Sequence, residues 1–374
     1  MAEFRSTEEL EHASLQRETE KQEKQAYTPR PKWQLAAAWV LAALLLAALT
    51  ALSLTACGAE EQPVTSQIFA MDTVMDFAVY GENAQAALTA ASQEINALEQ
   101  RLSRTRAGSE ISTLNETGSA ELSDETVQLL QSALALSDET GGAFDITIAP
   151  LVTAWGITSD TPRVPSQEEI ASLLPLVGSE HVRIDGNRVT LDAGCSVDLG
   201  GIAKGYASDR VAQIFREQGV TGTASLGGNV YVSGKKSDGS AWRVAVRDPQ
   251  NTDDYAAVLA LEDVFAITSG GYQRNFTAPD GTVYQHILDP KTGCPVQSDL
   301  LSVTIVSDSG TLADACSTAL YVMGEQEAVN FWRQTGGFEM VLITADGRLL
   351  YTPGLAEKIT TPEEGRYAAA AIDA

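Results

Sequence analysis

Two oxygen-bearing side chains lie four residues apart in the segment Ala313–Leu320. On a helix, Asp314 and Thr318 would therefore lie on one face, a single turn from each other. Carboxylate and hydroxyl oxygens suit Mg²⁺, which keeps several waters and bridges substrate phosphates. A hydrogen bond between the two side chains on a packed helix is the simpler interpretation, and the pair alone favours it.

A second segment, Asp198–Gly205, places Asp198 and two glycines where a helix is expected to begin, with Lys204 in its first turn. A helix N-terminus offers free N–H groups and the positive end of the helix dipole, which together favour a bound phosphate. The alternative is that Asp198 caps the helix and the glycines form a tight turn. Lys204 favours the phosphate, because a cation opposes the dipole at this end and needs another partner.

Two further segments carry polar groups next to turn residues. Gly141–Thr147 is expected to be a flexible turn that delivers Phe144 and Asp145 into a strand. His286 lies in an expected strand, Val283–Ile287, and its imidazole would titrate near neutral pH, as a general base requires. A single histidine is more often structural than catalytic, so His286 alone is a weak indication.

The overall composition excludes some classes of function. The chain has 374 residues, 50 acidic and 25 basic, and a formal charge of −25. Such a surface repels phosphate backbones, so nucleic acid is not an expected partner. Hydrophobic residues make up 44% and charged residues 20%, a balance typical of a folded globule and not of a disordered chain.

The N-terminal part predicts a membrane attachment. Residues 1–32 are expected to be a polar cytoplasmic or leader tail, and residues 33–56 a hydrophobic signal peptide or membrane anchor. Basic residues precede the apolar run and acidic ones follow it. The positive-inside rule therefore places the remainder on the outer face of the cell membrane.

A lipidation site is predicted where the apolar run ends. Leu54–Cys57 resembles a lipobox, in which Cys57 takes a lipid after the preceding peptide is cut, and residues 57–68 would form this site and a linker. An uncleaved membrane span is the alternative, since the run is about long enough to cross a bilayer. The three later cysteines are odd in number and have no Cys-x-x-Cys spacing, so neither a disulfide framework nor a structural zinc site is expected.

Residues 69–360 are expected to form one catalytic domain, followed by a C-terminal tail, residues 361–374. Helices and strands alternate without a regular βαβ repeat, which predicts an α+β or mixed α/β fold. Periodicity and turn residues predict the following elements. Helices are expected over 83–103, 123–140, 166–174, 202–215, 312–323 and 325–334, and strands over 73–80, 182–184, 189–191, 231–232, 243–246, 256–261, 265–268, 283–287, 302–306, 340–343 and 348–351.

Taken together, these segments resemble the FAD:protein FMN transferase family, also called ApbE. The likeness extends from about Met71 to Leu349. It is carried by the segments Met71–Met75, Ser109–Asn115, Ala143–Asp145, Asp198–Gly205, Gly227–Asn229, Thr268–Gly270, His286–Pro290 and Ala313–Thr318.

The resemblance implies mixed sheets with packed helices and an FAD site between two halves of the fold. By the family pattern, FAD would be contacted by Met71 or Met75, Ala143, Phe144, Asp145, Asp198, Lys204 and the backbone at Leu288. Mg²⁺ would be held by Asp314, Thr318 and the carbonyl of Gly201. One position departs from the pattern: Thr105 stands where the family often has a tyrosine that stacks on FAD, so that contact is in doubt.

The reaction implied by the resemblance is protein flavinylation. FMN would pass from FAD to a Thr or Ser hydroxyl of an acceptor flavoprotein, with His286 as general base, Asp314 at the metal, and AMP as leaving group. Family members typically act on electron-transfer proteins outside the membrane, which agrees with a lipoprotein address. An FAD pyrophosphatase that yields FMN and AMP, or a flavin-binding lipoprotein without activity, are the alternatives.

Overall fold

The computed structural model describes residues 62–157, 159 and 161–373. The predicted polar tail 1–32, the apolar run 33–56 and Cys57 lie outside these residues. Among the residues it describes, no helix is long and apolar enough to cross a membrane.

A nine-stranded sheet forms the centre of the described part, in the order β1-β2-β6-β7-β10-β13-β14-β15-β17. Neighbouring strands are antiparallel except β15 and β17, which run parallel. The strands of this sheet are β1 (Val64–Ala70), β2 (Thr73–Tyr80), β6 (Thr221–Leu226), β7 (Asn229–Ser233), β10 (Val264–Gly270), β13 (Leu300–Ser307), β14 (Glu339–Thr344), β15 (Arg348–Tyr351) and β17 (Ala368–Ala371).

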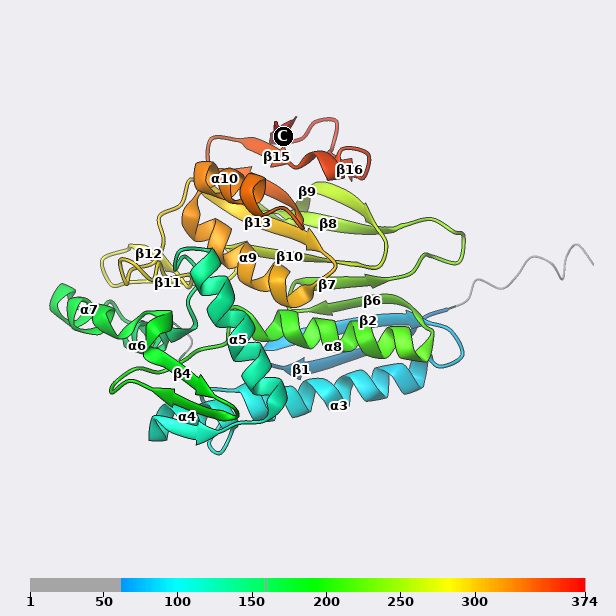
Figure 1. Cartoon of the computed structure of the whole chain (residues 1–374). Helices are drawn as coiled ribbons and strands as arrows, with labels where there is room; N and C mark the ends of the chain where they lie inside the picture. Colours follow the sequence, from blue (N-terminus) through cyan, green and yellow to red (C-terminus); the bar gives the residue numbers. More distant parts are fainter. Residues whose placement is uncertain (1–61, 158, 160, 374) are drawn as a thin grey trace, which may run out of the picture. The chain divides into compact units, whose positions relative to one another are not determined.

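Helices cover one face of the large sheet, and Figure 1 shows α3, α8 and α9 lying across it. The second face of β7, β10, β13 and β14 packs on a three-stranded sheet through a separate apolar cluster that includes Val232, Val246 and Leu259. The helices are α3 (Ala84–Leu102), α4 (Glu110–Thr117), α5 (Asp124–Glu139), α6 (Ala149–Trp155), α7 (Gln167–Leu173), α8 (Ala203–Gln218), α9 (Gly310–Met323) and α10 (Glu325–Thr335).

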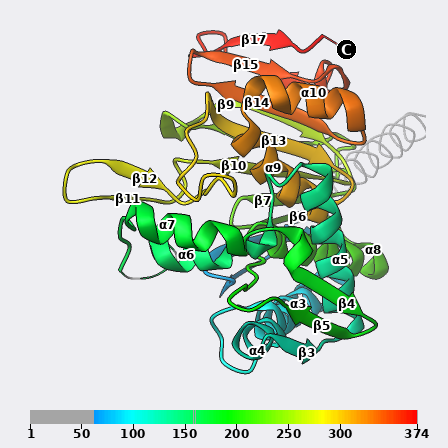
Figure 2. The ribbon, with the colours of Figure 1, turned by 60° about the vertical axis from the view of Figure 1, so that its left-hand side comes forward.

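Three smaller sheets complete the fold. The sheet β16-β9-β8 consists of β8 (Trp242–Asp248), β9 (Asn251–Leu261) and β16 (Ile359–Thr360), and the sheet β3-β5-β4 of β3 (Ser119–Glu121), β4 (Val182–Asp185) and β5 (Arg188–Leu191). The third is a hairpin of β11 (Asn275–Thr277) and β12 (Val283–Gln285), which extends away from the body of the fold in Figure 2. This mixed arrangement confirms the predicted fold class.

Local sequence patterns account for several elements. In α3 the apolar residues at helical spacing, from Ala84 to Leu102, are all buried against the sheet. Ser166 accepts a hydrogen bond from Glu169 N at 3.1 Å, the predicted capping interaction at the start of α7. Gly219 ends α8 in a left-handed conformation.

The folded part extends further at both ends than the predicted boundaries of 69 and 360. Strand β1 begins at Val64, inside the stretch predicted as linker, and β17 lies inside the predicted C-terminal tail. Both are edge strands: β1 pairs with β2, directly after it in the chain, and β17, a run of four alanines without alternation, pairs with β15. Such strands leave little periodic signal in the sequence.

Two local expectations were wrong. Phe144 and Asp145 do not enter a strand: Ile146–Ile148 form a 3₁₀ turn that leads into α6. Strand β12 ends at Gln285, so His286 lies just beyond the strand. In the first place Asp145 Oδ1 accepts from Thr147 N, which turns the segment back on itself. In the second place the hydrogen bond from His286 N to Arg274 O continues the β11–β12 pairing by one residue beyond the strand.

Candidate active site

Helices α8 and α9 approach each other most closely at two glycines. A Cβ atom added to Gly205 would lie 2.2 Å from the Gly310 carbonyl oxygen and 2.6 Å from Asp314 Cβ. Only glycine fits this position, because the backbones are almost in contact. Asp314, on α9, is 4% exposed, and its Oδ2 accepts a hydrogen bond from Gly205 N at 2.8 Å.

The Gly201 carbonyl lies just before α8. The N-cap of this helix is Ile202 and its first backbone bond runs from Tyr206 N to Ile202 O, so Gly201 O lies outside the helix ladder, and none of the hydrogen bonds among the described residues uses it. A Cβ added to Gly201 would lie 3.7 Å from Thr318 Oγ1. Gly201, Asp314 and Thr318 therefore lie close together where α8 begins beside α9.

The simpler interpretation, a hydrogen bond between the side chains of Asp314 and Thr318, is wrong. Thr318 Oγ1 lies 3.3 Å from Ser269 Oγ, which is also 2.8 Å from Ser317 Oγ. Within the described part of the chain no hydrogen bond joins the side chains of Asp314 and Thr318.

Gly201, Asp314 and Thr318 offer only oxygen atoms to a cation. No group of three or more His, Cys, Asp or Glu that could hold a metal occurs among the residues described. One carboxylate with a carbonyl and a hydroxyl is a hard, oxygen-only set of low charge. Such a set fits Mg²⁺ that takes its remaining ligands from water and substrate phosphates.

Asp198 lies beside these residues but does not cap α8. Its Oδ1 accepts from Gly200 N at 2.8 Å, and its Oδ2 forms an ion pair with Arg104 Nε at 2.7 Å. The N-cap of α8 is Ile202, which provides no side-chain acceptor. In the first turn Ala203 N donates to Leu199 O at 2.8 Å and Gly205 N donates to Asp314, so among the described residues only the Lys204 N–H of this turn has no acceptor. Lys204 Nζ donates to the Gly200 carbonyl at 3.4 Å.

The loop Ala143–Thr147 is held rigidly next to the start of α8. Asp145 accepts hydrogen bonds from Thr147 N at 2.7 Å and Thr147 Oγ1 at 2.5 Å, and Ser137 Oγ lies 3.2 Å from its second oxygen. Asp198 N donates to Ile146 O at 2.7 Å, which ties this loop to the Asp198 turn.

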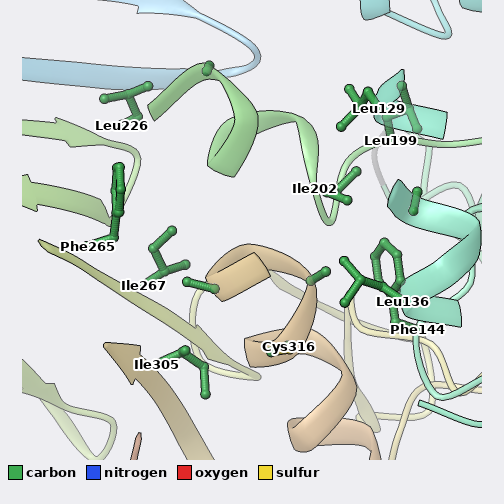
Figure 3. Close-up of a cluster of buried hydrophobic side chains, with 14 of the residues drawn as sticks. Leu129, Leu136, Phe144, Leu199, Ile202, Leu226, Phe265, Ile267, Ile305 and Cys316 are labelled. Atoms are coloured by element: carbon green, nitrogen blue, oxygen red, sulfur yellow. The ribbon is translucent and has the colours of Figure 1, made fainter. Parts of the chain in front are cut away.

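Phe144 fills the space between the loop and the helices. The added Cβ of Gly201 would lie 3.2 Å from Phe144 Cε2, and both Ala143 and Phe144 are buried. Figure 3 shows Phe144 next to Leu136, facing the helix that carries Cys316. This packing fixes the distance between the loop and the oxygen atoms of Gly201, Asp314 and Thr318.

His286 lies at the base of the β11–β12 hairpin and is half-buried. Its Nδ1 is 3.1 Å from the Arg274 carbonyl oxygen. Burial, together with the positive charges of Lys204 and Arg274, lowers the pKa of His286 to about 4. The imidazole is therefore neutral at pH 7, and it lies close enough to Lys204 for that positive charge to disfavour its protonation.

The remaining predicted contacts are distributed around this centre. Met71 occupies the turn between β1 and β2, whereas Met75 is fully buried in the core, so only Met71 is accessible to a ligand. Leu288 is buried and pairs with Pro295 across an isolated bridge. Thr105 is exposed, and its N–H donates to Ser103 Oγ at 3.3 Å.

Arg104 is a residue that the sequence analysis missed. It contacts Asp198 and also donates to Thr153 Oγ1 at 3.1 Å, so it joins the Asp198 turn to α6. Its position next to Thr105, where the family pattern is broken, was the only signal that could have indicated it. A cavity of about 480 Å³ also lies beside the hairpin, lined in part by Trp155, Tyr284 and Gln285, and it contains none of the predicted site residues.

The sequence of this chain is similar to those of known proteins. The profile of the ApbE family matches residues 71–342. The FAD:protein FMN transferase of Vibrio cholerae is 34% identical over 244 residues, covering 63% of this chain and 72% of that protein. That of Treponema pallidum is 31% identical over 313 residues, covering 75% and 84%.

The fold agrees with a solved member of the same family. The crystal structure of the ApbE protein of Thermotoga maritima has a TM-score of 0.73 and 34% identity, covering 77% of this chain and 96% of that one. The mixed sheets and the site between α8 and α9 thus define a protein of the flavin-transferase class. The chain belongs to the ApbE family.

Proposed function

We propose that this protein transfers FMN from FAD to a Thr or Ser hydroxyl of an acceptor protein and releases AMP. The observation that carries the proposal is that Gly201, Asp314 and Thr318 lie close together at the N-terminus of α8, in a chain whose relatives are named FAD:protein FMN transferase. Cleavage of a pyrophosphate requires oxygen atoms that bind the metal ion and, next to them, groups that bind the phosphates.

The surroundings suit a dinucleotide with a pyrophosphate. Lys204 supplies a positive charge and a backbone N–H, and the N-terminus of α8 the positive end of its dipole, for the phosphates, in a chain that is otherwise strongly acidic. Asp198 and the Phe144–Asp145 loop border the N-terminus of α8, and Met71 lies in the β1–β2 turn. These residues would hold FAD with its phosphates toward α8.

Mg²⁺ would be held by Asp314, Thr318 and the carbonyl of Gly201. When bound there it would offset the negative charge of the phosphates, which otherwise repels an incoming hydroxyl.

His286 is the proposed general base. In the transfer, the acceptor hydroxyl oxygen forms a bond to the phosphorus of the FMN part, the phosphorus–oxygen bond to AMP breaks, and AMP leaves with the electron pair. The proton of the hydroxyl passes to Nε2 of His286, which carries a lone pair because Nδ1 faces the Arg274 carbonyl. A bound phosphate would offset the charge of Lys204 and so raise the pKa of His286, making it a stronger base in the complex.

The decisive test is a mass measurement on an acceptor. The protein is incubated with FAD, Mg²⁺ and a Thr-containing acceptor domain, and the acceptor is analysed by intact mass. A gain of one FMN, with AMP in equal amount, is expected with Mg²⁺ and is expected to disappear with EDTA. An unmodified acceptor would overturn the proposal.

The same reaction distinguishes the alternatives. If FAD yields free FMN and AMP whether or not acceptor is present, water is the nucleophile and the protein is a pyrophosphatase. If FAD stays bound and intact, it is a flavin-binding protein. Asp308→Asn is the matched control for the variant Asp314→Asn. Asp308 is an exposed residue just before α9 and contacts none of the site residues.

We further propose that the catalytic part is tethered at the outer face of the cell membrane through residues 33–56 or a lipid on Cys57. The support is the apolar run with basic residues before it and acidic residues after it. Intact mass of the membrane-extracted protein separates the two anchors, because a lipoprotein would begin at Cys57 and carry acyl mass.

A further inference from the structure

The turn between β1 and β2 has an unusual backbone. Met71 and Asp72 both have positive φ, 48° and 60°, a region that residues other than glycine rarely occupy. Aspartate tolerates it better than most. The strain must be balanced by contacts that hold the turn in place.

Arg274 provides those contacts from a point 202 residues further along the chain. Its guanidinium donates to Asp72 Oδ2 at 2.6 Å and to the backbone oxygen of Asp72, also at 2.6 Å. One planar group therefore binds both the side chain and the main chain of the turn, which fixes its orientation more closely than a single ion pair would.

The same residue also holds His286. The backbone oxygen of Arg274 accepts from His286 N at 3.1 Å and lies 3.1 Å from His286 Nδ1. A carbonyl oxygen can only accept, so Nδ1 carries the proton and Nε2 is left free. The β1–β2 turn, Arg274 and His286 are therefore connected through one residue at the base of the projecting β11–β12 hairpin (Figure 2).

We propose that Asp72 and Arg274 form a clamp that positions His286 for the transfer reaction, with Arg274 fixing the ring through its carbonyl and Asp72 fixing Arg274. This inference rests on the proposed function of His286. Asp72 and Arg274 are positioning residues, because neither has to touch the reacting atoms.

The clamp contributes little to global stability. The side chains of Arg274 and Asp72 are 42% and 71% exposed, and an ion pair this exposed contributes little to the free energy of unfolding. A change at Asp72 therefore leaves the protein folded, while the orientation of the imidazole is lost. Misplacement of a catalytic group by about 1 Å can cost about 100-fold in rate.

The test uses Asp72→Gly, which accepts the positive φ but removes the carboxylate, and Arg274→Lys, which keeps the charge but replaces the rigid planar fork with a flexible ammonium group. Each is expected to lower kcat for FMN transfer by about tenfold or more, with the KM for FAD changed less than about twofold and the melting temperature nearly unchanged. Asp76→Asn is the control, since Asp76 is an exposed carboxylate on β2 that bonds to Gln67 and does not contact the hairpin. Unchanged kcat in both variants would overturn the clamp.

A second readout does not depend on activity. Nitrogen NMR of the full chain, with His286→Gln to assign its signals among the three histidines, reports which ring nitrogen is protonated. The parent protein is expected to show the proton on Nδ1, and Asp72→Gly a mixture of both forms. An unaltered spectrum in Asp72→Gly would overturn the clamp even if no transfer activity were found, whereas loss of the transferase proposal alone would leave this result intact.

Discussion

Asp314 and Gly205, 109 residues apart in the chain, are joined by a 2.8 Å hydrogen bond from the Gly205 amide to the Asp314 carboxylate. The contact ties the start of α8 to the middle of α9. It also occupies one carboxylate oxygen of Asp314, so the hydrogen bond orients one of the three groups proposed to hold Mg²⁺.

The Asp314 carboxylate is expected to be required for metal-dependent turnover. Asp314→Asn can keep the hydrogen bond to Gly205 N through its amide oxygen but removes the charge that a cation needs. We expect transfer to fall below about 1% of the parent rate, a loss of the size seen when a main electrostatic group is removed, with little change in melting temperature. Rates measured across a Mg²⁺ titration test this. A parent-like Mg²⁺ dependence in Asp314→Asn, or an equal loss in Asp308→Asn, would contradict it.

Gly205 is expected to tolerate no side chain. Gly205→Ala would bring a Cβ to 2.2 Å from the Gly310 oxygen, so the two helices must separate. Overpacking of this kind costs about 1–3 kcal/mol. Thermal unfolding should therefore show a lower melting temperature, and the apparent affinity for Mg²⁺ should weaken. Glu217→Ala on the exposed part of α8 is the control, and equal behaviour of both variants would argue against the close crossing.

Arg104 is expected to affect binding of FAD more than the chemical step. Its ion pair with Asp198 joins side chains that are only 19% and 15% exposed, so Arg104→Ala leaves a partly buried carboxylate without its partner. We expect the KM for FAD to rise by about tenfold, with a smaller change in kcat. Steady-state kinetics measure both. Arg106→Ala, two residues away and exposed, should behave like the parent; if it weakens FAD binding equally, a general charge effect is the cause.

The pH dependence is expected to report the lowered pKa of His286. The charged form is disfavoured by burial, Lys204 and Arg274, so the imidazole stays unprotonated as the pH falls through 6.5 and gains a proton only near its pKa of about 4. In FAD hydrolysis or transfer followed from pH 8 downward, the rate should therefore hold past pH 6 and fall at lower pH. A bound phosphate would shift this fall upward.

The matching variant is His286→Ala, which should slow transfer by about 10²–10⁴-fold if His286 is the base. The low-pH fall should also vanish in its residual rate. A loss of only a few-fold would mean that His286 positions the substrate and does not accept the proton.

Local sequence determined much of the scaffold. The spacing of Ala84 to Leu102 predicts α3 because a helix repeats every 3.6 residues, and Ser166 with Glu169 predicts the start of α7 because both groups act within one turn. The pair Asp314 and Thr318 could be placed on one helical face for the same reason.

The tertiary structure decided how these pieces serve the site. Asp314 with Gly205, Arg104 with Asp198, and Arg274 with Asp72 are partners separated by long stretches of chain, and none follows from periodicity. Asp145 binds its own loop and does not continue a strand, and β1 and β17 exist only because the sheet supplies their partners. Sequence periodicity indicates which residues share one face of one helix or strand. A site is formed by faces of different elements, which meet only after folding. Here the close backbone contact of Gly205 and Gly310 brings α8 and α9 together.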